Sequence, residues 1–198
     1  MIEHPWYDEV PPTAPLMQGD FIESCPVLVF DQVPTVGNAQ SNEALLAELD
    51  KAHGVQMVRA IVMTQACDLE HRNVRNVILC PIYHLEEYRG LWEERRRQSG
   101  KNASTTDWNG HTKQVRDGKV WNLTMLQKRD ASSPDVLSIP HQVVDFHEVF
   151  SLPLDFLTAW VQAKGEPRLR LRPPYREHLS QAFARFFMRV GLPDDISL

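Results

Sequence analysis

Residues 55–65, VQMVRAIVMTQ, form an almost continuous apolar run that contains a single charged residue, Arg59. A run of this kind without helical periodicity is typical of a β-strand that is buried on both faces. A second run, VILCPIY at residues 77–83, follows after a short polar stretch. We therefore expect residues 56–65 and 76–83 to be neighbouring strands in the interior of one sheet.

The segments on either side of this strand pair predict helices and short strands at irregular spacing. Helices are expected from EALLAELDKAH, HLEEYRGLWEERRRQSG, LPLDFLTAWVQAKG and YREHLSQAFARFFMRVGLP, and strands from GDFIESCPVLVFD, KVWNLTML, DVLSI and HQVVDFHEVFSLP. The polar stretch at residues 99–118 is interpreted as a loop. This order indicates an α+β fold, with a small, mainly antiparallel, partly closed β-barrel, helical insertions and a C-terminal helix.

The domain organisation follows from the distribution of proline and of apolar residues. Residues 1–17 are proline-rich and lack periodicity, so they predict an extended arm. Residues 18–198 are expected to form one α+β domain that ends in the C-terminal helix. In that helix Phe183, Phe186, Phe187 and Val190 belong to one apolar stripe, which should pack on the domain.

Composition restricts the possible classes of protein. The chain has 198 residues, of which 42% are hydrophobic and 24% are charged, as is typical of a soluble globular domain. No apolar run approaches the roughly 20 residues of a membrane helix, so no membrane association is expected. The three cysteines are odd in number and widely spaced, which favours a reducing, cytoplasmic location over a disulfide framework.

The net charge of −5 is distributed unevenly along the chain. Residues 1–75 contain 4 Lys or Arg against 11 Asp or Glu, whereas residues 90–130 contain 9 against 5. This balance disfavours a general nucleic-acid-binding protein but leaves a local basic face open. Arg168, Arg170 and Arg172 alternate with leucines, which predicts a strand edge guarded by arginines, or a stripe that contacts phosphates or a protein partner.

Three short segments together resemble the MazF/PemK-type small β-barrel toxins. They are QGDF at residues 18–21, VRAIVMT at 58–64 and VILCPIY at 77–83, so the resemblance covers residues 18–84. It implies the barrel fold and a ribonuclease-like activity. Arg59 then corresponds, with a displacement of one position, to the RNA-cleaving arginine of that family, and Tyr83 stands where the family has a functional threonine.

The loop after the first buried strand is the main candidate site, because Gln65, Cys67, Asp68 and His71 cluster there. Functional residues tend to lie on loops that a rigid scaffold positions. Gln65, Asp68 and His71 are therefore predicted binding residues, together with Arg59 and Tyr83. Asp68 is also suited to cap the turn or helix that follows.

Cys67 is a candidate nucleophile, provided that a histidine reaches its sulfur atom. If HQVVDFH is a strand, then His141, Asp145 and His147 share one face. Asp145 is then placed to orient His147 as the base, which gives the hypothetical catalytic set Cys67, His147 and Asp145.

A metal site is the other chemistry that the spacing suggests. Cys67 and His71 are four residues apart, as are Cys80 and His84, and such ligand types suit zinc. In a strand, however, Cys80 and His84 would lie roughly 13 Å apart, so no metal site is predicted unless Pro81 breaks the strand. No glycine-rich phosphate loop is present, and no cofactor is predicted.

The sequence therefore predicts a module that binds a protein partner or a nucleic acid, with its function centred on residues 65–71. A cysteine-dependent hydrolase and a ribonuclease-like enzyme are the alternatives. The sequence does not determine the oligomeric state.

Overall fold

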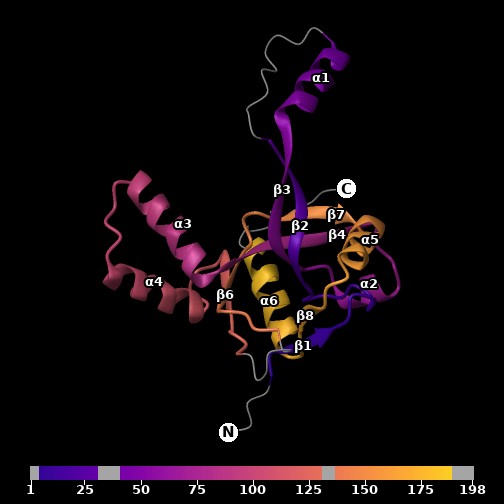
Figure 1. Cartoon of the computed structure of the whole chain (residues 1–198). Coiled ribbons are helices and arrows are strands. Elements are labelled where there is room, and N and C mark those ends of the chain that lie inside the picture. Colours follow the sequence, from indigo (N-terminus) through magenta and orange to yellow (C-terminus); the bar gives the residue numbers. More distant parts are fainter. Residues whose placement is uncertain (1–4, 31–40, 131–136, 189–198) are drawn as a thin grey trace, which may run out of the picture.

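A computed structural model describes residues 5–30, 41–130 and 137–188 of the chain (Figure 1). The strands are β1 (Tyr7–Val10), β2 (Phe21–Phe30), β3 (His53–Val62), β4 (Asn76–His84), β5 (Leu123–Leu126), β6 (Gln142–Asp145), β7 (Phe150–Pro153) and β8 (Arg168–Leu171). The helices are α1 (Asn42–Ala52), α2 (Ala66–Glu70), α3 (Leu85–Gln98), α4 (Thr105–Arg116), α5 (Leu154–Lys164) and α6 (Tyr175–Phe187).

The two apolar runs are neighbouring strands, as expected from the sequence. β3 and β4 pair antiparallel, with Ile61 opposite Cys80. β4 also pairs with β6 and β7, and the main sheet has the order β2-β3-β4-β6-β5. All these pairings are antiparallel, so the α+β class with a mainly antiparallel sheet is confirmed.

The main sheet has a hydrophobic cluster on each face. Ile61 and Cys80 point to one face, where they pack with Leu179 of α6. Ala60 and Val62 point to the other face, where they pack with residues of α5. Each helix thus covers the alternate side chains of the same strands, as a layered fold requires.

The predicted apolar stripe of the C-terminal helix packs only in part. The rings of Phe183 and Phe186 lie 5.5 Å and 6.1 Å from the ring of Phe146, which is buried. Phe187, in contrast, is 55% exposed, so the prediction was wrong for this residue. Val190 lies outside the described residues.

The proline-rich N-terminal segment is held on the body by Arg168 and Arg170, which both donate to the Pro15 carbonyl. Arg168 is 5% exposed, and its Nε donates to the fully buried Asp20 carboxylate at 2.8 Å. The Arg168 guanidinium also donates to the carbonyls of Pro11, Ala14 and Pro15. The expectation of an exposed arginine edge was therefore wrong at Arg168, because the Asp20 carboxylate and the carbonyls use its donors.

Gly19 explains the Gly-Asp pair at the start of β2. Its φ is +83°, and a Cβ at this position would lie 2.9 Å from the Cβ of Leu171. Only glycine fits this conformation and this close approach without strain. Gly19 thereby places Asp20 directly beneath the arginines of β8.

Residues 99–118, which the sequence predicts as a loop, contain the helix α4. Ser104 and Asp107 form a capping box at its start. Trp108 is buried against Trp92 of α3, with the two rings 5.3 Å apart. The N-terminal cap and this aromatic contact together stabilise a helical pair, α3–α4, that stands beside the sheet (Figure 1).

The long strands β2 and β3 extend beyond the rest of the sheet. β3 pairs with β4 only at residues 60–62, whereas it pairs with β2 down to residue 53. We use "the ribbon" for the projecting part, residues 25–30 and 53–58, which stands out from the body with α1 at its far end (Figure 1). β2 continues through Cys25 as one strand, with a register shift between Ile22 and Cys25.

Candidate functional site

One face of the ribbon exposes four large apolar side chains. Leu28 and Val55 lie directly opposite each other, and Phe30 and Met57 lie two residues farther along their strands on the same face. Their exposed fractions are 61%, 62%, 58% and 56%, respectively. We call this set the ribbon face. Contiguous apolar surface of this kind on a soluble protein usually marks an interaction site.

The ribbon face continues a surface that is buried in the body. Met57, Arg59 and Ile61 alternate along β3 and therefore point to the same side of the sheet. At Ile61 that side is covered by the cluster that includes α6, whereas at Met57 and beyond no helix of the described chain covers it. The ribbon face is thus an uncovered extension of a covered sheet layer.

A hollow of about 470 Å³ lies where the ribbon meets the body. Met57, Arg59, Tyr83, Glu87 and Leu91 contribute to its lining. The hollow brings together Arg59 and Tyr83, the two residues that the toxin resemblance singles out. Its size is within the range of about 300–1,000 Å³ that is common for ligand sites.

The arginine of this hollow is already engaged by an acidic neighbour. Arg59 Nη2 donates to Glu87 Oε2, while Arg59 Nε is buried without a hydrogen-bond partner among the described residues. The Tyr83 hydroxyl donates to Glu148 at 2.7 Å. A phosphate group would have to compete with these carboxylates for both side chains.

Glu23 is a second carboxylate at the base of the ribbon. It lines the Arg59 hollow and the two neighbouring hollows. Burial raises the pKa of Glu23, Arg59 opposes this effect, and the nearby Glu166 carboxylate adds to it. Among the described residues, the Arg59 guanidinium forms its salt bridge with Glu87 and not with Glu23.

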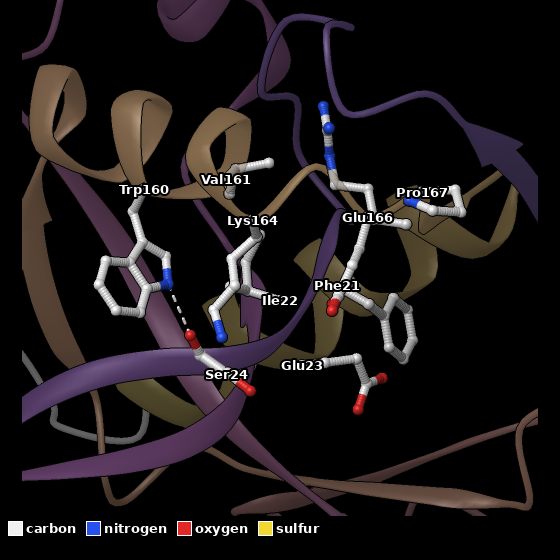
Figure 2. Close-up of a pocket in the computed structure, with 10 residues that line it drawn as sticks. Phe21, Ile22, Glu23, Ser24, Trp160, Val161, Lys164, Glu166 and Pro167 are labelled. Atoms are coloured by element: carbon white, nitrogen blue, oxygen red, sulfur yellow. Dashed lines mark hydrogen bonds between the residues drawn. The ribbon is translucent and has the colours of Figure 1, made fainter.

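A smaller cavity lies on the other side of Glu23, between β2 and α5 (Figure 2). Trp160 and Lys164 reach from α5 toward Ser24, and the indole Nε1 donates to the Ser24 carbonyl at 2.7 Å. The cavity volume is about 40 Å³, which accommodates a few water molecules but not a substrate. This feature anchors α5 on β2.

The loop predicted as the main site is a short helix on the surface of the body. Gln65 precedes α2, and its Oε1 lies 3.8 Å from the Cys67 sulfur, which is exposed. No hydrogen bond to the Asp68 carboxylate occurs within the described residues, so the predicted capping role was wrong. His71 is exposed and donates its backbone N–H to the Cys67 carbonyl at 3.1 Å.

The predicted Asp145–His147 pair is present, although Cys67 does not join it. Asp145 is buried, and its Oδ1 lies 3.6 Å from His147 Nδ1 and accepts the His147 backbone N–H at 3.0 Å. Arg95 and Asn122 approach the same carboxylate. Figure 1 places α2 and β6 on opposite sides of the body, and no hydrogen bond among the described residues joins Cys67 to His147.

Two further absences hold for the described residues alone. No group of three or more His, Cys, Asp or Glu side chains in residues 5–30, 41–130 and 137–188 is arranged to hold a metal ion. Within these same ranges, no helix combines the length and the apolar character that crossing a membrane requires.

Sequence reasoning missed the ribbon face because it treated residues 55–65 as buried throughout. A usable signal was strand length: ten residues of β-strand span about 33 Å, more than the short strands of the body can cover. The absence of Asp, Glu, Lys and Arg from residues 25–30 and 53–58 was a second signal. Apolar residues without a covering layer are exposed, whatever their pattern.

Comparison of the chain with protein-family models, with curated proteins and with solved structures finds no match.

Proposed function

We propose that this protein is a binding module for another protein and that the ribbon face is its docking surface. The observation that carries the proposal is the exposure of Leu28, Phe30, Val55 and Met57 on one side of a projecting ribbon. A partner element laid on this face would supply the layer that α6 supplies over the body.

The magnitude of the burial supports a binding role with a limited affinity. Full burial of one such side chain contributes about 1.5–3 kcal/mol, so covering the exposed part of all four contributes roughly 4–7 kcal/mol. A micromolar complex needs about 8 kcal/mol after the costs of association. A partner therefore has to contact groups beyond the ribbon face.

A ribonuclease-like function is the second candidate, and one observation favours it. Arg59 and Tyr83 line the same hollow, as the resemblance to the toxin barrels implies. The partly closed barrel is also part of this hypothesis and not of the described fold. The described strands form an open order, with β2 and β5 at its ends. The Glu87 and Glu148 contacts disfavour it, because they occupy the groups that would meet RNA.

The hydrolase alternative lacks a supporting contact. His147 packs edge-on against Phe186 at 5.1 Å, and no hydrogen bond in the described part of the chain joins it to a thiol. The loop at residues 65–71 exposes no large apolar side chain, which favours the ribbon face over this loop as the docking surface.

Site-specific photo-crosslinking tests the docking surface. A photoreactive phenylalanine analogue at Val55 should form a discrete adduct in cells that express the chain. The same analogue at Phe156, an exposed aromatic residue of α5, is the control. An adduct at Val55 that the Leu28→Thr substitution abolishes supports the proposal, whereas equal adducts at both positions contradict it.

A further inference from the structure

The ribbon face is bounded by acidic groups at both of its ends. At the far end, α1 carries Glu43, Glu48 and Asp50 against the single base Lys51. Lys51 is already paired with Glu48 at 2.8 Å. Glu43 and Asp50 therefore keep their charges unbalanced by any Lys or Arg of the helix.

The near end is acidic for a different reason. Arg59 lies near enough to Glu23 to lower its pKa, but its guanidinium donates to Glu87, so one cation faces two carboxylates. The hollow beside Met57 is therefore lined by two carboxylates, Glu23 and Glu87, against the single base Arg59. In the neighbouring hollows Lys164 and Arg168 offset Glu166, so the excess charge lies on the side of the ribbon face. The apolar face between the two ends contains no charged residue that would offset either of them.

This charge distribution discriminates between possible occupants. In a twofold symmetric pair of ribbons, α1 of one copy would lie either against α1 of the other copy or against its Glu23 end. Both arrangements bring carboxylates together, and like charges across an interface are unfavourable. A second copy of the chain is thus a poor occupant.

We propose that the ribbon face binds a segment of a partner protein that is apolar on one side and carries Lys or Arg at both ends. This inference rests on the proposed function and adds the chemistry of the partner. Residues 53–59 of β3 span about 20 Å, which sets the spacing between the basic ends. That distance corresponds to about 13 residues of helix or six of strand.

Two labelled probe peptides of 14 residues test the inference by fluorescence anisotropy. One has the sequence KKLLAALLAALLKK, and the other has glutamate in place of every lysine. The lysine peptide should bind the full chain roughly tenfold more tightly at about 50 mM salt, and high salt should reduce the difference. The variant Leu28→Thr/Val55→Thr should weaken binding of the lysine peptide by roughly tenfold.

Matched charge variants locate the acidic groups. Glu43→Gln/Asp50→Asn, on α1, should reduce the preference for the lysine peptide. Asp68→Asn/Glu70→Gln removes the same charge from α2, on the body, and should leave that preference unchanged.

Three results would overturn the inference, and they have different consequences for the proposed function. Equal or tighter binding of the glutamate peptide overturns the charge rule but preserves the docking face, provided that Leu28→Thr/Val55→Thr still weakens it. Binding that Leu28→Thr/Val55→Thr does not weaken overturns both the inference and the proposed function. If neither peptide binds, the inference fails. Sedimentation then decides whether a second copy covers the face, because in that case the wild type would be dimeric and Leu28→Thr/Val55→Thr monomeric.

Discussion

Leu28 and Val55 are directly opposed across β2 and β3, and both side chains are about three-fifths exposed, at 61% and 62%. A cross-strand pair of this type normally stabilises a sheet by packing beneath another layer. Here the pair stabilises only the ribbon to which it belongs. Its position, on an uncovered extension of a covered sheet face, is the basis for assigning a docking role to the ribbon.

Replacing this pair should not affect folding. Leu28→Thr/Val55→Thr keeps residues compatible with a strand, and exposed positions usually change stability by about 0.5 kcal/mol or less. Ile61→Ala, a truncation at a fully buried position of the same strand, should cost about 2–5 kcal/mol. Urea denaturation of both variants measures the contrast, and a large loss in the double threonine variant would show that the face is packed.

The Asp20–Arg168 pair should be essential for stability. Arg168→Ala breaks the buried pair and leaves the Pro11 and Ala14 carbonyls without this donor, while Arg170 still donates to the Asp20 carboxylate. The expected loss is about 3 kcal/mol, at the lower end of the range for breaking a buried pair. Arg172→Ala is the matched control, because Arg172 lies 3.6 Å from Asp8 with both side chains substantially exposed. Loss of an exposed pair costs about 1 kcal/mol at most. Equal losses by chemical denaturation would contradict this assignment.

The three thiols should react very differently in the folded protein. Burial raises the pKa of Cys25 and of Cys80 to about 12, whereas Cys67 is exposed. A thiol reagent at neutral pH should therefore modify one cysteine in the folded chain, and Cys67→Ser should abolish that reaction without loss of stability. Rapid modification of Cys67 at acidic pH would instead favour the hydrolase alternative, since only an activated thiol reacts there.

Acid should loosen the α3–α4 pair through His111. The Tyr88 hydroxyl lies 3.0 Å from His111 Nε2, and burial, followed by the Arg96 charge, lowers the His111 pKa below its usual 6.5. Below pH 6.5 the unfolded chain therefore binds a proton that the folded pair does not, so stability falls as the pH falls. The loss ends only once the pH drops below the lowered pKa of the folded state.

Hydrogen-exchange protection factors of the α4 amides at pH 7 and pH 5 measure this effect. His111→Gln should reduce the difference in protection between the two pH values. His71→Gln, at an exposed position on the body, should leave it unchanged. Protection that is independent of pH in the wild type would contradict the assignment.

The sequence was sufficient for the parts of the fold that depend on local pattern. The β3–β4 pair followed from two apolar runs, and the closeness of Asp145 and His147 followed from their spacing in the chain. The exposure of Leu28 and Val55 could not be obtained in this way, because it depends on how far the neighbouring strands extend. A buried strand and an exposed apolar strand have the same local sequence pattern.

The candidate site was harder to predict for the same reason. The cluster at residues 65–71 has many reactive groups, but which of them meet a partner side chain depends on three-dimensional contacts, and α2 lies away from His147. The roles of Arg168 and Asp20 could not be predicted either, since these two partners lie about 150 residues apart in the chain. The α4 helix could have been found, because Ser104 and Asp107 form a recognisable capping pair.

The most direct test of the docking role is the affinity of the purified partner that crosslinks to Val55. Its Kd is measured by titration calorimetry against the wild type, Leu28→Thr/Val55→Thr and Phe156→Ala. The double threonine variant should bind roughly tenfold more weakly and with a less negative heat-capacity change, because less apolar surface is buried. Phe156→Ala should bind like the wild type. The same Kd for all three proteins would show that the ribbon face is not the docking surface.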